Sequence, residues 1–82
     1  MSLNKTTGVT AFVLLNTKNG NGKKAVDYLS ELKGVKEASL LYGDFDVLAR
    51  IETANMNSLN KILLENVRKT PGLDMMSTHI AI

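Results

Sequence analysis

The chain has 82 residues, 44% of them hydrophobic, a net charge of +2 and no cysteine. That length suits one compact domain, and the composition is that of a globular protein rather than of a disordered one. The lack of cysteine excludes disulfide frameworks, thiolate zinc sites and cysteine nucleophiles, and a single histidine leaves few ligands for a transition metal. We therefore expect a domain that holds neither a metal nor a cofactor.

The ten Lys and Arg residues are scattered along the chain, and their longest runs are Lys23-Lys24 and Arg68-Lys69. Nucleic-acid-binding domains usually gather such residues on one face or in one run, so direct binding to DNA or RNA is disfavoured. The longest apolar run, residues 11–15, is much shorter than the ~20 residues that span a bilayer. Residues 1–8 have no hydrophobic signal core, and we therefore expect a cytoplasmic protein without a membrane partner.

The first half of the chain gives strand, helix and strand signals in turn. Residues 7–15 are rich in β-branched and aliphatic residues, which predicts a strand, and residues 16–22 are turn formers. From Lys23, apolar residues recur at three- and four-residue steps, which predicts an amphipathic helix that stops at Gly34. Residues 35–42 predict a second strand.

The second half gives a strand, a helix and a final strand. Gly43-Asp44 is a tight connection to a third strand at residues 45–52, and Asn55 is a suitable N-cap for a second helix. Pro71-Gly72 closes that helix, and residues 73–82 form the last strand. The order βαββαβ predicts an α+β, ferredoxin-like sandwich, in which a four-stranded antiparallel sheet carries two helices on one face. We expect residues 1–82 to form this single domain, with residues 1–8 as an N-terminal leader.

The strands of this predicted sheet carry apolar residues on both faces. In the first strand Val13 and Leu15 point to one face while Phe12 and Leu14 point to the other, and the other strands show the same two-sided pattern. Two helices cover only one face, so a monomer would expose a larger apolar patch than soluble proteins carry. We therefore expect an isologous homodimer that packs sheet against sheet.

The segment Tyr42-Gly43-Asp44-Phe45-Asp46 gathers two carboxylates, a phenol and a glycine at a strand-to-strand corner. One interpretation is a hairpin turn, in which glycine supplies an unusual φ and aspartate hydrogen-bonds the neighbouring backbone. The other is a ligand corner, in which backbone N–H groups receive a carboxylate and an aspartate receives an ammonium. Composition alone leaves both interpretations open.

For the remaining candidate residues, the sequence pattern indicates structural roles. The glycine-rich residues 19–24 precede a helix but lack the spacing of a P-loop or a GxGxxG motif. His79 has no Ser or Cys partner in a triad pattern, and Ser77 and Thr78 beside it gain interest only if the last strand borders a pocket. Because no nucleophile, base and oxyanion hole occur together, we predict no catalytic residue.

Three marks stand in a characteristic order: Gly34-Val35 after the first helix, the corner Tyr42-Gly43-Asp44-Phe45-Asp46, and the turn Pro71-Gly72 followed by a strand with Ser77-Thr78. Together they resemble the effector domain of the leucine- and asparagine-responsive (Lrp/AsnC) transcription regulators, known as the RAM domain, for regulation of amino-acid metabolism. The resemblance runs over residues 9–82, nearly the whole chain.

The resemblance implies an oligomeric amino-acid sensor and not an enzyme. Dimers of that family assemble into rings such as octamers or decamers, and a free amino acid or a similar effector binds between dimers. Its ligand-binding residues correspond here to Leu41, Tyr42, Gly43, Asp44, Asp46, Ser77 and Thr78. Whether Asp44 or Asp46 receives the ammonium stays open, because one of the two can instead hold the turn.

Regulators of this family carry an N-terminal helix-turn-helix domain, whereas only residues 1–8 precede the first strand here. We therefore expect a stand-alone effector module or a piece of a longer regulator, which does not bind DNA itself and can co-assemble with full-length relatives. The alternative is a small dimeric α+β-barrel enzyme, a monooxygenase or isomerase, and a further rival is an RNA-binding module of the same fold. The single His79 and the absence of tryptophan disfavour the enzyme, and Phe12 alone is too few aromatic residues for the RNA-binding module.

Overall fold

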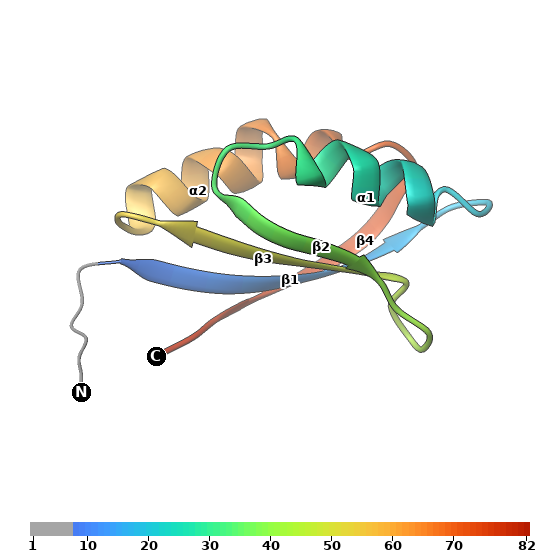
Figure 1. The fold of residues 1–82 in the computed structure, drawn as a ribbon, viewed down its shortest axis with the longest axis horizontal. Helices are drawn as coiled ribbons and strands as arrows, with labels where there is room; N and C mark the ends of the chain where they lie inside the picture. Colours follow the sequence, from blue (N-terminus) through green and yellow to red (C-terminus); the bar gives the residue numbers. More distant parts are fainter. Residues whose placement is uncertain (1–7) are drawn as a thin grey trace.

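A computed structural model of the chain describes residues 8–82, and of the predicted leader only Gly8 lies inside this range. One sheet is covered on a single face by two helices, in the order βαββαβ (Figure 1). The elements are β1 (Val9–Thr17), α1 (Gly22–Ser30), β2 (Val35–Leu40), β3 (Val47–Thr53), α2 (Met56–Glu65), the 3-10 turn η1 (Val67–Lys69) and β4 (Leu73–Ile80). The predicted α+β, ferredoxin-like fold is confirmed.

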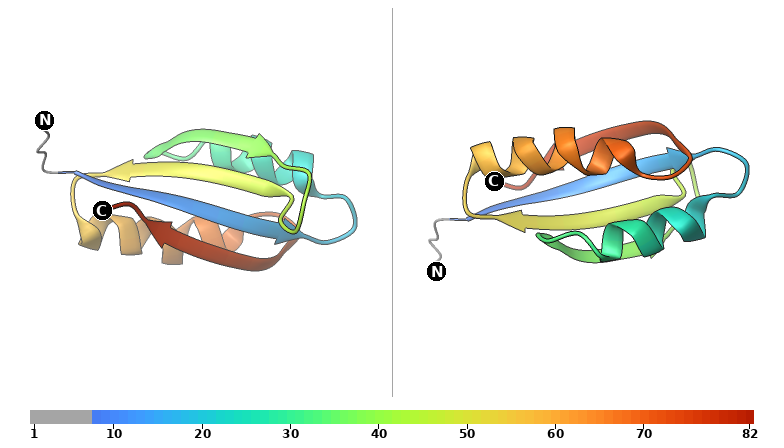
Figure 2. Two further views of the ribbon diagram at one scale, coloured as in Figure 1. Left: turned by 90° about the horizontal axis from the view of Figure 1, so that it is seen from below. Right: turned by 90° about the horizontal axis from the view of Figure 1, so that it is seen from above.

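The four strands lie in the order β2-β3-β1-β4, and every neighbouring pair is antiparallel. β1 and β3 are therefore central, with Leu15 opposite Val47, while β2 and β4 form the edges. Seen from below, the sheet lies in front of both helices, and from above the helices lie over it side by side (Figure 2). The opposite face of the sheet, which we call the open face, is left uncovered by residues 8–82.

The core lies between the sheet and the helices. Alternate residues of the central strands are completely buried there, as the two-residue period of a strand requires. They are Ala11, Val13, Leu15, Val47, Ala49 and Ile51. Ala25 and Leu29 of α1, Leu59 of α2 and Val67 of η1 close the other side. Each fully buried Val, Leu or Ile of this set contributes about 1.5–3 kcal/mol.

The helix ends differ from the predicted ones, whereas the start of α2 agrees. Asn55 Oδ1 accepts a hydrogen bond from Ser58 N at 2.8 Å, which confirms the predicted N-cap. α1 ends at Ser30, four residues before Gly34, because the chain there passes into a turn closed by Val35 N donating to Leu32 O at 3.2 Å. α2 likewise ends at Glu65, before η1 and well before Pro71-Gly72. Within residues 8–82 no helix is long and apolar enough to cross a membrane.

The open face carries both apolar side chains and an ion-pair cluster. Phe12 is 38% exposed and Met75 is 59% exposed, and Leu14 lies directly opposite Leu48 between them. On the same face Arg50 pairs with Glu37 at 3.5 Å and with Glu52. The expectation of a two-sided apolar sheet therefore holds around Leu14 and Leu48, and the charged cluster borders this apolar area, since Arg50 lies directly opposite Phe12.

The turn before β2 gives a stability prediction. A Cβ at Gly34 would lie 2.8 Å from Ile62 Cδ1, and the residue has a φ of +96°, a conformation that L-residues rarely adopt. Gly34→Ala is therefore expected to lower the free energy of unfolding by about 1–3 kcal/mol in urea denaturation. The matched control is Gly43→Ala, where no atom lies within 4 Å and the free energy should change by less than about 0.5 kcal/mol. Equal losses of unfolding free energy in the two variants would contradict the prediction that a side chain at position 34 is strained.

Candidate functional site

The predicted ligand corner is a loop between β2 and β3 that is longer than expected. The sequence predicted a tight connection at Gly43-Asp44, but β2 ends at Leu40 and β3 begins at Val47. Leu41 N donates to Asp46 O at 2.8 Å, so the hairpin closes there and residues 42–45 form its tip.

Asp46 fastens this loop to the end of β1. Its Oδ1 accepts a hydrogen bond from Thr17 N at 3.0 Å, and its Oδ2 accepts one from Thr17 Oγ1 at 2.6 Å. Its backbone N donates to Leu15 O at 3.1 Å. Both carboxylate oxygens are thus used inside the chain, and the side chain is half-buried. Of the two aspartates that the sequence left open, Asp46 is the one that holds the turn.

The tip of the loop is exposed. The Tyr42 side chain is fully exposed, Asp44 and Gly43 are exposed, and Leu41 lies at 36% exposure beside them. Within residues 8–82 the Asp44 carboxylate makes no hydrogen bond or ion pair. The tip therefore presents a phenol, a free carboxylate and backbone N–H groups to whatever approaches it, without enclosing a pocket of its own.

The two hydroxyl residues of β4 lie on opposite faces of the sheet. Ser77 stands opposite Leu14 on the open face, whereas Thr78 stands opposite the buried Val13 on the helix-covered face. β1 and β3 separate β4 from β2 in the sheet, and neither of the two hollows described below is lined by the loop, by Ser77 or by Thr78.

Two features of the structure were not identified from the sequence, a side-chain contact on β4 and a groove near Thr53 at the end of β3. Ser77 Oγ lies 2.8 Å from His79 Nε2 on the open face, a contact that the i, i+2 spacing on a strand allows. A groove of about 540 Å³ lies at the end of β3 that carries Thr53, and a smaller hollow of about 450 Å³ lies next to it. None of the predicted ligand-binding residues lines the groove or the hollow. No three His, Cys, Asp or Glu side chains in residues 8–82 are placed to hold a metal ion.

Comparison with known proteins matches nearly the whole chain to one family of ligand-binding domains. A family model described as the Lrp/AsnC ligand-binding domain matches residues 10–82. The HTH-type transcriptional regulator PF0250 of Pyrococcus furiosus is 29% identical over 77 residues, which are 90% of this chain and 51% of the regulator. The chain thus spans about half the length of that relative. Homocitrate synthase of Sulfurisphaera tokodaii is 37% identical over 54 residues, 66% of this chain but only 12% of the enzyme.

Solved structures show the same fold. The hypothetical protein PHS023 from Pyrococcus horikoshii has a TM-score of 0.85 and 38% identity, covering 90% of this chain and 89% of that one. The complex of the transcriptional regulator NMB0573 from Neisseria meningitidis with L-Met has a TM-score of 0.79 at 17% identity, covering 93% of this chain and 51% of that one.

The hydrogen bonds of Asp46 give a second prediction. Asp46→Ala removes both acceptors of Thr17 and is expected to lower the free energy of unfolding by about 1–3 kcal/mol, measured by urea denaturation. Thr17→Val removes only the hydroxyl bond and should cost less. Asp44→Ala is the control, since this exposed carboxylate has no partner in residues 8–82 and its loss should leave stability unchanged. If Asp44→Ala cost as much as Asp46→Ala, the assignment of the turn-holding residue would be wrong.

Proposed function

The chain belongs to the Lrp/AsnC ligand-binding domain family, and on that premise we propose that it is an oligomeric module that senses a free amino acid and is not an enzyme. The family match over residues 10–82 is the observation that carries this proposal. The L-Met complex of NMB0573, which shares the fold, supports an amino acid as the class of effector. Because the relatives of this chain are transcription regulators, we also propose a cytoplasmic location for it.

We place the effector between subunits, at the loop of one chain and at β4 of another. Asp44 is the residue that we assign to the ammonium group, because both oxygens of Asp46 already accept from Thr17. The backbone N–H of Gly43 donates to the carboxylate of the effector in this proposal. Leu41 and Tyr42, exposed beside it, contact the effector side chain.

The division of β4 between two faces suggests different tasks for its hydroxyls. Ser77 and its partner His79 lie on the open face, which we propose as the contact between the two sheets of a homodimer. Thr78 lies on the other face of the same edge strand and is only half-buried, so it remains within reach of a neighbouring dimer. We therefore assign the effector contact to Thr78 and a dimer contact to Ser77. Rings such as octamers or decamers would follow from repeating the contact between dimers.

A second candidate concerns the partner of the module. A stretch of 54 residues, 66% of this chain, is 37% identical to part of a homocitrate synthase, which favours an enzyme of that kind as a second candidate partner. Size-exclusion chromatography of the chain mixed with a full-length relative regulator, or with that enzyme, separates the possibilities. Co-elution with the regulator supports hetero-assembly, co-elution with the enzyme supports the second candidate, and separate elution in both mixtures removes both.

A thermal-shift screen of the twenty amino acids tests the sensing function. One amino acid, or a few of related chemistry, is expected to raise Tm, since an effector at about a hundred times its Kd stabilises the folded chain by ~2.7 kcal/mol. For a domain of this size that is a shift of roughly 10–20 °C. Asp44→Ala should abolish the shift, whereas the exposed Asp27→Ala on α1 should retain it. A flat screen contradicts the function, and a shift that survives in both variants contradicts only the site.

The dimer contact is tested on the open face. Leu48→Glu places a charge at the half-buried centre of that face and is expected to convert the dimer into a monomer in sedimentation velocity. Leu64→Glu is the matched control, because Leu64 is 61% exposed on α2 and away from the open face. A wild-type chain that sediments as a monomer at micromolar concentration would refute the proposed contact.

A further inference from the structure

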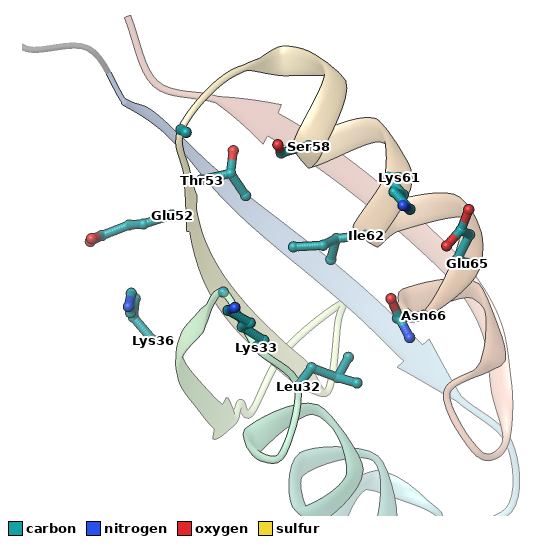
Figure 3. Close-up of a pocket in the computed structure, with 12 residues that line it drawn as sticks. Leu32, Lys33, Lys36, Glu52, Thr53, Ser58, Lys61, Ile62, Glu65 and Asn66 are labelled. Atoms are coloured by element: carbon teal, nitrogen blue, oxygen red, sulfur yellow. The ribbon is translucent and has the colours of Figure 1, made fainter.

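A groove runs between α2 and the turn that joins α1 to β2, and its volume is about 540 Å³ (Figure 3). One wall is a single face of α2, where Lys61 and Ile62 lie three and four residues after Ser58, and Glu65 lies one further turn along. The other wall is the turn that carries Leu32, Lys33 and Gly34. Figure 3 shows the side chains of Leu32 and Ile62, one from each wall, at the space between the walls, with lysines on both walls.

One end of the groove lies where the two helices are tied together, at Asn66. Tyr28 Oη of α1 donates to Asn66 O beyond α2 at 2.7 Å, which ties the helices together there. α1 then ends at Ser30, while the face of α2 continues without a helix opposite it. The missing side chain of Gly34 leaves Ile62 in contact with the backbone of the turn and only half-buried. The floor of the groove is therefore apolar and accessible.

Positive charge at this groove is not neutralised. Lys33, Lys36 and Lys61 all line it, and none of them forms an ion pair within residues 8–82. Of the two acidic residues in the lining, Glu52 is already paired with Arg50 on the open face. Glu65 alone is left against three lysines. An anion that entered the groove would gain charge-assisted hydrogen bonds from both walls.

We propose that this groove is a second ligand site, which binds a small organic anion with a carboxylate or phosphate group and a short apolar portion. Its volume lies within the range of small-molecule sites, and an apolar floor with a few charged groups at the rim is their usual composition. Leu32 and Ile62 receive the apolar portion, and Lys33 and Lys61 hold the anionic group from opposite walls. The site is independent of the proposed effector site, because the loop meets β3 at Val47 and the groove lies at its other end, Thr53, roughly 20 Å away.

Titration of the full chain, followed by amide NMR shifts, tests this site. The probes are 3-methylbutanoate and 3-methylbutyl phosphate, which share an apolar portion, and 3-methylbutylamine, which carries the opposite charge. Either anion is expected to give saturable shifts at Gly34, Ile62 and Asn66, with a Kd on the order of 1 mM. The amine should give none. Comparison of the two anions shows which acidic group the groove prefers.

Charge variants separate the groove from general attraction to a basic protein. Lys33→Gln with Lys61→Gln is expected to weaken anion binding by roughly tenfold or more. Lys24→Gln with Lys69→Gln removes the same charge from exposed positions outside the groove and should leave binding unchanged. Equal weakening in the two double variants, equal shifts with the amine, or no saturable shift at groove residues would each overturn the proposal. Asp44→Ala should leave this titration unaffected, so failure here is distinguishable from failure of the amino-acid screen.

Discussion

The register of β1 against β3 determines which side chains form the core and where the loop between β2 and β3 lies. With Leu15 opposite Val47, the alternate residues of both central strands are completely buried under the helices. A slip of β3 by one residue would move its buried residues, Val47, Ala49 and Ile51, to the open face and bring Leu48 under the helices in their place. The same register brings Asp46 beside the end of β1, where Thr17 donates to both of its oxygens. The position of the loop is thus a direct consequence of core packing.

This sheet gives the chain three surfaces of different chemistry. The open face has an apolar middle around Phe12 and Leu14, which suits a second copy of itself. Within residues 8–82, the loop end of β3 presents at Asp44 a carboxylate without an ion pair, while the far end presents lysines without one around a half-buried Ile62. Under the two proposals above, one small domain serves a protein partner and two kinds of ligand on surfaces that do not overlap.

Much of the fold could be predicted from the sequence, because the signals are local. Strand and helix periods gave the βαββαβ order and the buried face, and a single polar residue, Asn55, marked the start of α2. The loop could not be predicted in the same way. Leu41 and Phe45 look like strand residues, and the contact that decides the matter joins Asp46 to Thr17, 29 residues away. The groove has no motif at all, since its side chains come from a turn, a strand end and a helix face.

The attachment of the loop to β1 bears on how a sensor of this design responds. A ligand shifts an equilibrium only by its difference in affinity for two states. Hydrogen bonds that join Asp46 to Leu15 and Thr17 fix the base of the loop to the core, whereas Asp44 at its tip makes none within residues 8–82. Under the proposed function, the two states are then separate and assembled subunits, since Asp44 and Thr78 meet only across a contact between copies. An effector that touches both would favour assembly, and by linkage assembly would raise the affinity for the effector by the same factor.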